Sequence, residues 1–562
     1  MKKIRSNKGF QATAHKLSLC DRLRTLQSYT VLPVGRRLNP DVHTKGISTM
    51  SKTSYLAVST LILLLAVLLI TACYLHGPGL HSDTAAYFKP AWTSSLTNLP
   101  TYHAPIYSVS IYCGTVLGLA PTTVAMIINL LAVILSLVIV LSGFRRYFGN
   151  ASLAFAGFLA ISYPFVYNNA WAMSEALFYP FLLAFVLSMF RYFDAPSIFR
   201  SLLAGVLVSI ASLTRFAGIS FFVAGILLIL IHNRSAIDAR LREIAAYIIA
   251  FLLPFGSYYM WNIQRSGSGL HREFGINPLT YETYRTGIVT ISEWMMPYRL
   301  YATLGTTLAG IGIAIGFSAL ALFVFRDIRK DRYHTSVPAV LAIVYLLFVN
   351  TSIWLSDMQT PLDHRILSPL YIMLLIYLAA VISRSRTRYL LLLKGLTVYL
   401  LLLNGIRDIS FIKSARANGL GFASVEWQHN ELLEYVAKQA KQRSIYSNAP
   451  DAISLLTGVD SVQWIPFKKN MYTRTTNSGF YSQMEQIAED MLSSNAAIVI
   501  FRAKHRSDYE TPDYLPTVSE LQTLTGSTPT RDDKFGVILE TGANNQIQRT
   551  GGPLGGPPDA DL

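Results

Sequence analysis

The sequence predicts a mainly α-helical, polytopic membrane protein with about 11 transmembrane helices and a small C-terminal α/β domain. Of its 562 residues, 52% are hydrophobic and 14% are charged, whereas soluble domains contain about 25% charged residues. The hydrophobic residues gather in runs of roughly 18 to 22, the length that a helix needs to cross about 30 Å of hydrocarbon. After about residue 406 the runs end, and the composition becomes that of a soluble domain.

The charge distribution and the cysteine count exclude two other classes of protein. The net charge is +16, but most of the excess lies in the N-terminal tail and in alternate short loops between apolar runs. This pattern is typical of loops that stay in the cytoplasm, and not of a surface that binds nucleic acid. The three cysteines, Cys20, Cys73 and Cys113, are too few for a disulfide framework or a standard zinc site.

The basic residues 1–53 predict a cytoplasmic tail without a cleavable signal, and translation from Met50 is an alternative start. An odd number of spans then puts the C-terminus on the extracytoplasmic side of the membrane. Two of the spans are short and predict tilted or broken helices, those at 201–214 and 217–232. The predicted spans cover residues 55–75, 122–142, 152–167, 175–193, 201–214, 217–232, 244–263, 301–325, 337–355, 366–383 and 389–405.

Two outward loops, residues 76–121 and 264–300, are too long to be simple connectors, so they are candidate functional segments. The first contains an amphipathic stretch, Ile106 to Leu119, which predicts a helix lying along the membrane surface. The second is rich in Tyr, Trp and Gly, as expected for a chain near lipid headgroups. With these loops, residues 54–406 form one predicted transmembrane domain.

Residues 407–545 predict a soluble extracytoplasmic α/β domain. Helical spacing runs from Glu426 to Gln439, a short strand opens at Ser444, and Ala496 to Phe501 is an apolar β run. The tail 546–562 is rich in Gly and Pro and is predicted to be disordered.

Five ionisable residues lie at the outward edge of the predicted spans: Asp83, His103, Glu175, Arg215 and Arg365. Ionisable groups near hydrocarbon cost a few kcal/mol each, so most of those that persist have a function. Under the predicted topology all five reach the same outer level from separate parts of the chain. The sequence therefore predicts one shared site.

The acidic residues and the histidine each have a chemical and a structural interpretation. Asp83 would accept the proton of an incoming hydroxyl, or else Asp83 or Ser82 would cap a helix. Glu175 begins a span, where the helix dipole favours an acid, so it supports the site either chemically or structurally. His103 is a supporting candidate or an ordinary loop histidine.

The two arginines are predicted to bind the phosphate of a lipid-linked donor. A guanidinium stays charged and donates paired hydrogen bonds to phosphate oxygens. The structural alternative for Arg215 and Arg365 is anchoring at the membrane interface, or pairing with Asp363 or Glu175.

Six short motifs occur in one order along residues 55–405, and together they resemble the GT-C membrane glycosyltransferases. The branch is the one that contains protein O-mannosyltransferases and the lipid A aminoarabinose transferase. The motifs are His103-Ala-Pro-Ile-Tyr107, Phe144-Arg-Arg-Tyr-Phe-Gly149, Ile161-Ser-Tyr-Pro164, Met173-Ser-Glu-Ala-Leu-Phe178, Leu213-Thr-Arg-Phe-Ala-Gly218 and Asp363-His-Arg-Ile-Leu-Ser-Pro369.

The resemblance implies an inverting transfer of a sugar from a polyprenyl-phosphate donor to an extracytoplasmic acceptor, with Asp83 as the base. Many relatives have a second acid directly after this base, where this chain has Thr84, which disfavours a metal held by an acidic pair. Ala104 replaces the first proline of the family's His-Pro-Pro stretch. No cofactor and no metal-binding residues are predicted, and dependence on a divalent cation is left as an alternative.

The predicted location is the bacterial inner membrane, and the predicted partners are a polyprenyl-phosphate sugar, membrane lipids and an acceptor hydroxyl on a glycan, a lipid or a protein. The alternatives are a flippase for lipid-linked oligosaccharides, which needs polar groups in mid-span, and a non-catalytic envelope scaffold. A ligase that uses lipid-diphosphate donors would share the same chemistry.

Overall fold

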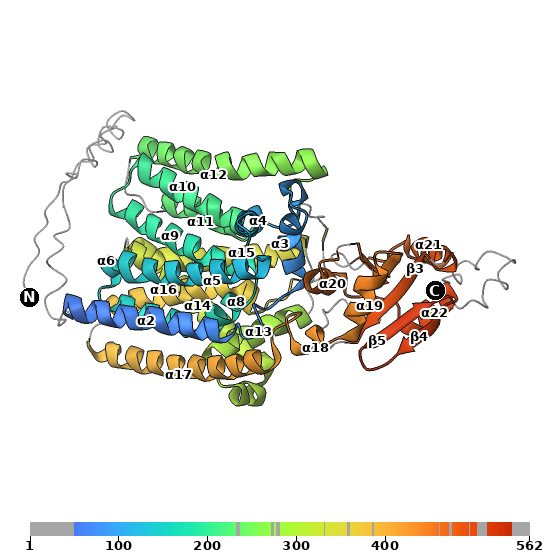
Figure 1. The fold of residues 1–562 in the computed structure, drawn as a ribbon. Coiled ribbons are helices and arrows are strands. Elements are labelled where there is room, and N and C mark those ends of the chain that lie inside the picture. The colour runs from blue at the N-terminus through green and yellow to red at the C-terminus, as the bar shows by residue number, and fades with distance from the viewer. Residues whose placement is uncertain are drawn as a thin grey trace, which may run out of the picture. The chain divides into compact units, whose positions relative to one another are not determined.

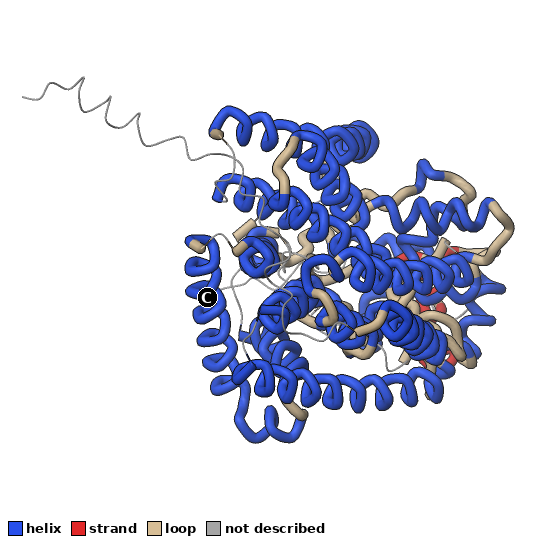
Figure 2. Tube along the Cα trace, turned by 90° about the vertical axis from the view of Figure 1, so that its left-hand side faces the viewer, coloured by secondary structure: helices blue, strands red, loops and turns tan. Residues whose placement is uncertain are grey.

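The computed structural model is mainly helical, with one small sheet near the C-terminus (Figures 1 and 2). The N-terminal tail and the C-terminal tail lie outside the described residues, so both of those predictions stay untested. The structure describes residues 50–541 except 232–235, 271–274, 277–280, 331, 357–359, 385–386, 460, 471–474, 494 and 503–513.

Within the described ranges, eight helices are long and apolar enough to cross a membrane, or nine if one bent pair counts as a span. The chain is a membrane protein with the predicted mainly α-helical architecture. The eight are formed by α2 (Lys52–Ala72), α5 (Pro121–Val138) with a π-helical turn (Ile139–Gly143), α9 (Ser174–Asp194), α12 (Ile237–Ser266), α14 (Tyr298–Arg329), α15 (Tyr333–Leu355), α16 (His364–Arg384) and α17 (Thr387–Asn418).

The other predicted spans also coincide with helices. The span predicted at 152–167 is a pair of helices, α7 (Ala151–Ala160) and α8 (Tyr163–Asn169), with a bend of 52° between them. Pro164 is the second residue of α8. A proline suits the first turn of a helix, because it has no N–H to leave unbonded there. The two short spans are single helices, α10 (Ile198–Thr214) and α11 (Gly218–Ile231).

Helix α10 packs closely on α12 through a row of small residues. A Cβ added to Gly205 would lie 2.5 Å from the carbonyl oxygen of Tyr247, so only glycine permits this approach. One turn to either side, Ser201 and Ser209 donate hydrogen bonds to backbone carbonyls of α12. Small residues four apart commonly join membrane helices in this way.

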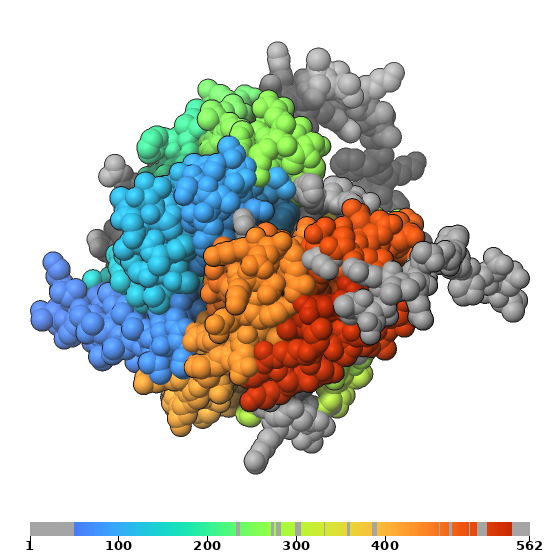
Figure 3. All heavy atoms as spheres, turned by 45° about the vertical axis from the view of Figure 1, so that its right-hand side comes forward, coloured from blue at the N-terminus to red at the C-terminus, as the bar shows by residue number. Residues whose placement is uncertain are grey.

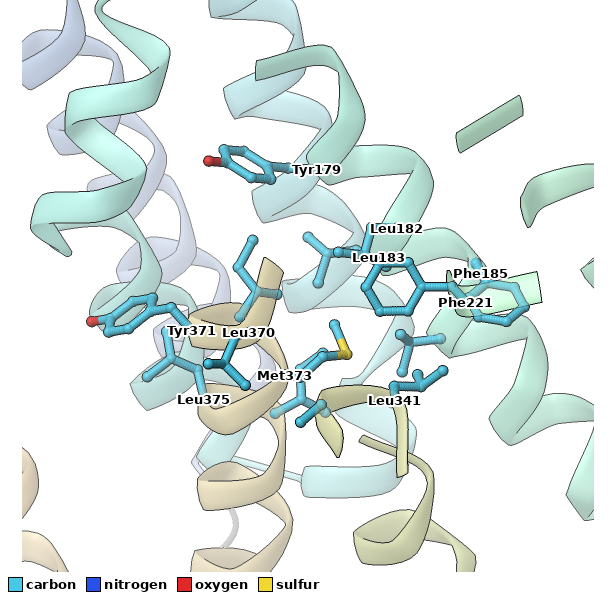
Figure 4. Packing of buried hydrophobic residues seen from close by; sticks show 14 of the residues in the cluster. Tyr179, Leu182, Leu183, Phe185, Phe221, Leu341, Leu370, Tyr371, Met373 and Leu375 are labelled. Atoms are coloured by element: carbon cyan, nitrogen blue, oxygen red, sulfur yellow. The ribbon is translucent and has the colours of Figure 1, made fainter. Parts of the chain in front are cut away.

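The centre of the bundle is filled by large apolar side chains of α9, α11, α15 and α16 (Figure 4). Phe221 stacks on Tyr345 with ring centroids 5.5 Å apart, and Leu182, Leu183 and Met373 are fully buried beside them. This dry core fixes the ends of α9 and α16, which carry Glu175 and Arg365.

Short helices occupy the two long loops. The first loop holds α3 (Ser82–Trp92), η2 (Leu96–Asn98) and α4 (Pro105–Val116), and the second holds α13 (Tyr281–Met295). In α4 the side chains of Tyr107, Ser108 and Ile111 are fully buried, and the helix packs against α3 and α5. The helix α6 (Arg145–Phe148) is a single turn at the other end of α5.

The C-terminal part contains a five-stranded sheet in the order β2-β1-β3-β5-β4. Strands β2, β1 and β3 are parallel, and β5 and β4 are antiparallel to their neighbours. The predicted strands at Ser444 and Ala496 are β1 and β3. The elements are α18 (Val425–Gln428), α19 (Glu431–Gln439), β1 (Ser444–Ser447), α20 (Pro450–Thr457), β2 (Gln463–Trp464), α21 (Phe480–Leu492), β3 (Ala496–Phe501), α22 (Val518–Thr525), β4 (Thr528–Asp532) and β5 (Gly536–Glu540).

Strand β3 is buried on both faces, which explains its continuous apolar run. Ala497 and Val499 face the core formed with α19 and α20. Ile498 and Ile500 face the core formed with α21 and α22. The sheet is therefore the middle layer of three.

A backbone contact joins this part of the chain to the first long loop. Leu80 donates and accepts hydrogen bonds with Leu420 and Phe422, and a Cβ on Gly421 would lie 2.1 Å from the oxygen of Leu80. Helix α20 packs against α3, and the corresponding blue and orange segments adjoin in Figure 3. The last apolar helix ends at Asn418, beyond residue 405 where the span was predicted to end. The division of the chain into domains stays a prediction.

Candidate active site

Asp83 lies in the first turn of α3, at the point where the chain from α2 meets the C-terminal part. The structural alternative, in which Ser82 or Asp83 caps this helix, is wrong. His81 is the N-cap, and its ring nitrogen accepts from the backbone N–H of Asp83. Because His81 satisfies the helix end, the carboxylate of Asp83 is left for other partners.

Thr84, which replaces the second acid of many relatives, has a structural role. Its hydroxyl accepts from the backbone N–H of His81 at 3.0 Å and donates to the carbonyl of Ala172 at 3.1 Å. The side chain is fully buried. Thr84 therefore ties the helix that carries Asp83 to the segment that precedes Glu175.

The structure brings four of the predicted residues into one ion network. Arg365 lies between two acids: its Nε donates to Glu175 Oε1 at 2.9 Å, and its Nη2 donates to Asp83 Oδ2 at 2.7 Å. Arg215 forms a second ion pair with the same Glu175 oxygen. The four side chains come from α3, α9, the end of α10 and the start of α16.

Burial divides the network into an inner and an outer part. The exposed fraction of the side chain is 2% for Glu175, 14% for Arg215, 18% for Arg365 and 27% for Asp83. Glu175 is the buried centre of the network, and Asp83 is the acid that solvent reaches.

Neighbouring side chains hold this arrangement in place. Asp363 accepts hydrogen bonds from the backbone N–H groups of Arg365 and Ile366 at 3.0 Å each, and so caps α16. His103, the fifth predicted residue, lies 3.8 Å from Asp83 Oδ1, and its ring packs on Tyr87. All five predicted residues therefore meet at one end of the bundle.

Asp83 is held in its ionised form. Burial raises the pKa of the carboxyl, but the charges of Arg365, His103 and His81 outweigh burial, so the pKa lies well below its ordinary value. Burial also lowers the pKa of His81. A carboxylate that is charged and partly exposed at neutral pH can accept a proton from a bound hydroxyl.

Comparison with known proteins gives a family model that matches part of the chain, and a similar fold. Residues 102–261 match the sequence model of a family described as dolichyl-phosphate-mannose-protein mannosyltransferase. The structure is similar to that of ArnT from Cupriavidus metallidurans bound to undecaprenyl phosphate, with a TM-score of 0.54 and 12% identity over 88% of this chain and 99% of that chain. The chain therefore shares its overall fold with ArnT, and residues 102–261 resemble the sequence model of this mannosyltransferase family.

Two other solved structures are similar at lower scores. The oligosaccharyltransferase of Archaeoglobus fulgidus has a TM-score of 0.44 and 10% identity over 80% of this chain and 70% of that chain. Arabinofuranosyltransferase AftD from Mycobacteria has a TM-score of 0.44 and 13% identity over 88% of this chain and 42% of that chain. No sequence among the curated proteins matches this chain.

The ion network does not fit a divalent cation held between the acids. The guanidinium of Arg365 bonds to both Asp83 and Glu175, so a positive group already lies where a metal would bridge them. Thr84 donates and accepts hydrogen bonds of its own and supplies no carboxylate. No step is therefore assigned to a metal.

Sequence reasoning missed a second polar pair next to Arg365. His364 bonds through Nε2 to Glu293 Oε2 at 2.9 Å, and its Nδ1 accepts from the indole of Trp294 at 3.3 Å. Glu293 and Trp294 lie in α13 of the second long loop. Burial raises the pKa of Glu293, but the hydrogen bond and charge of His364 outweigh it and lower that pKa. The pair connects this loop to the helix that carries Arg365.

Sequence reasoning also missed Asp451, which lies in the first turn of α20, the helix that packs on α3. Burial and, to a smaller extent, the charge of Asp83 raise the pKa of Asp451 to about 7. The described residues form no hydrogen bond or ion pair with its carboxyl. The docking of two distant segments creates this environment, and no local sequence pattern signals it.

The raised pKa of Asp451 predicts a pH-dependent effect on stability. The folded protein holds this proton more tightly than the unfolded chain, so the free energy of unfolding falls as the pH rises from about 4 to about 7. Asp451→Asn removes the ionisable group and with it the loss of stability at high pH. The free energy of unfolding at pH 8 should therefore increase by about 1–2 kcal/mol after solvent screening. The gain should be smaller at pH 4.5, as measured by thermal unfolding in detergent.

The control for this prediction is Glu485→Gln, which changes an exposed acid on α21. It should leave the unfolding temperature unchanged at both pH values. Equal stabilisation by Asp451→Asn at pH 4.5 and pH 8 would show that its carboxyl is not protonated in the folded state.

Proposed function

We propose that this protein is a GT-C class membrane glycosyltransferase, which moves a sugar from a polyprenyl-phosphate donor to a hydroxyl of a glycan, lipid or protein acceptor, with inversion at the anomeric carbon. The observation that carries the proposal is the ion network, in which an accessible carboxylate, Asp83, lies 2.7 Å from Arg365 at the end of an apolar bundle. The network supports the proposal because it holds a carboxylate and a guanidinium group, which suit the roles of base and phosphate-binding cation, within one site.

Asp83 would act as the general base. Its carboxylate takes the proton of the acceptor hydroxyl while the acceptor oxygen forms a bond to the anomeric carbon. The bond from that carbon to the phosphate oxygen breaks at the same time, and polyprenyl phosphate leaves with the electron pair. A positioned base of this kind typically contributes about 10²–10⁴-fold to a rate.

The two arginines would stabilise the leaving phosphate. Arg365 uses Nε and Nη2 for the acids, and Arg215 uses Nη1. In the described part of the chain no partner is recorded for Nη1 of Arg365 or for Nη2 of Arg215. Fixed cations next to the oxygen that gains charge lower the barrier without reorganisation. The undecaprenyl phosphate in the ArnT structure supports a donor of this class.

Arg365→Lys tests the proposed phosphate contact. A lysine keeps the charge but cannot donate to both acids and to a phosphate from one planar group. We expect kcat/KM for the donor to fall about 10- to 100-fold, which corresponds to about 1.4–2.7 kcal/mol. Arg443→Lys, which changes an arginine paired with Glu540 in the sheet domain, is the matched control and should retain the parental kcat/KM. Equal kcat/KM in the two variants would show that Arg365 does not contact the donor phosphate.

The activity itself is tested with purified protein in nanodiscs and radiolabelled polyprenyl-phosphate sugars. Label that moves to a soluble or lipid acceptor supports the proposal. Label that crosses a liposome membrane without transfer supports a flippase instead, and binding without either supports a scaffold. Transfer only from diphosphate donors would indicate a ligase.

The orientation belongs to the same proposal. We place the N-terminus in the cytoplasm of a bacterial cell and the ion network, with the sheet domain of residues 407–545, on the outer side of the inner membrane. A membrane-impermeant thiol reagent tests this with single cysteines at Glu426 and at Lys330. Labelling of the Lys330 position and protection of the Glu426 position in intact spheroplasts would reverse the orientation.

A further inference from the structure

A groove with a volume of about 650 Å³ lies beside β2, between the edge of the sheet and α21. It is separate from the ion network and belongs to the C-terminal part of the chain. Its volume is within the range of about 300–1,000 Å³ that is usual for ligand sites. The function proposed above does not use this groove.

Aromatic side chains form one part of the groove. Trp464 and Phe467 lie with their ring centroids 5.4 Å apart at an interplanar angle of 38°, and both are partly exposed. Tyr446, on the neighbouring strand β1, also lines the groove. Aromatic faces of this kind stack on the C–H faces of sugar rings, while tryptophan and tyrosine each add a polar group at the rim.

Polar groups in the groove are available to a ligand. Gln463 and Gln486 line it with exposed amides. Within the described residues, no hydrogen bond is recorded for these two amides, for the hydroxyl of Tyr446 or for the indole N–H of Trp464. A primary amide donates and accepts at once, which matches the hydroxyl groups of a sugar.

The groove is preformed. Asn477 donates to the carbonyl of Phe467 at 2.9 Å and accepts from the N–H of Gly479 at 3.0 Å. The backbone N–H of Lys468 donates to Tyr514 at 2.7 Å, and its ammonium group pairs with Glu520. These bonds fix the aromatic segment before any ligand binds, which reduces the entropy lost on binding.

The charge of the groove restricts its ligand. Lys469 is the one charged side chain among the described lining residues. Neutral amides and hydroxyls make up the rest of its polar lining. This combination favours a neutral or acidic glycan over a basic peptide, which would need carboxylates.

We infer that this groove binds an oligosaccharide segment of a glycan acceptor. The inference rests on the proposed function and names the acceptor class for it. Strand β1 connects the two sites: Tyr446 lines the groove, and Asp451, five residues later, lies in the helix that packs on α3. A glycan held at the groove would thereby be retained by the domain that docks beside Asp83.

The test is direct binding by the full-length protein in nanodiscs. The probes are the hexasaccharides of β-1,4-glucose, of N-acetylglucosamine and of mannose, with an oligogalacturonate as the acidic probe. We expect saturable binding of at least one probe. Trp464→Ala and Gln486→Ala, which change two walls of the groove, should each weaken that binding at least 10-fold.

Tyr481→Ala is the matched control, because Tyr481 is a 63% exposed aromatic residue on α21 outside the groove lining. It should bind the probe as the parent does. Absence of saturable binding to all four probes, equal loss in Tyr481→Ala, or binding of a peptide that Trp464→Ala abolishes would overturn the inference.

The inference and the proposed function fail separately. Asp83→Asn should bind the probe as tightly as the parent, because the groove does not include Asp83. Sugar transfer without glycan binding would overturn the inference alone. Glycan binding without any transfer would overturn the proposed function alone.

Discussion

Replacing Asp83 with asparagine is expected to lower the rate of sugar transfer by at least about 100-fold. The amide cannot take a proton from the acceptor, although it fills nearly the same space. Arg365 keeps its bond to Glu175 and loses one anionic partner, so the affinity for a phosphate-bearing donor should stay the same or increase. Single-turnover transfer and equilibrium binding of the donor measure the two effects separately.

Asp363→Asn is the matched control for Asp83→Asn. Asp363 is a nearby acid that accepts hydrogen bonds from two backbone N–H groups at the start of α16. It is not proposed to act as the base. This variant should lose about 1 kcal/mol of stability and retain most of its transfer rate. Full activity in Asp83→Asn would refute the base assignment, and a weaker donor affinity would indicate that Asp83 binds the donor instead.

Replacing Glu175 with glutamine is expected to destabilise the folded protein by about 3–5 kcal/mol. Glu175 is the common partner of Arg215 and Arg365, and its side chain is 2% exposed. Without its charge, two nearly buried guanidinium groups face each other with Asp83 as the single remaining acid of the network. Thermal unfolding in detergent should show a lower midpoint, and the yield of folded protein should fall.

The control for Glu175→Gln is Asp194→Asn at the other end of the same helix. Asp194 accepts from Tyr147 at 2.8 Å and pairs with Arg146 at 3.5 Å, in a more exposed setting. Its loss should cost about 1 kcal/mol. A loss of equal size in both variants would mean that the two arginines have other partners when Glu175 is neutral.

The spans could be predicted because their signal is local. An apolar run long enough to cross the membrane identifies a helix whatever it packs against, and each predicted span coincides with a helix or a bent pair. Strand β3 was predicted for the same reason, since it is buried on both faces. The bend between α7 and α8 was missed, because Pro164 was included within one continuous apolar run.

The candidate site could be predicted only in part. The cost of ionisable groups near hydrocarbon identified the five residues that the structure brings together. Pairing of Arg215 and Arg365 with Glu175 was one of the predicted alternatives, and the structure shows it. The simultaneous hydrogen bonds of Arg365 to Glu175 and Asp83 were not predicted, because they depend on side-chain positions that no spacing encodes. The cap by His81 was missed because histidine is not a usual capping residue. Asp451 was missed because contacts across hundreds of residues create its surroundings.

The hydrogen bonds between Leu80 and the segment Leu420 to Phe422 have a consequence for biogenesis. The turn that leads into Asp83 is completed by residues that the ribosome synthesises only after the last apolar helix has been made. Insertion of the helices by the translocon therefore precedes the final shaping of the reactive centre. The backbone contacts that complete this turn therefore form only after Leu420 to Phe422 have left the ribosome.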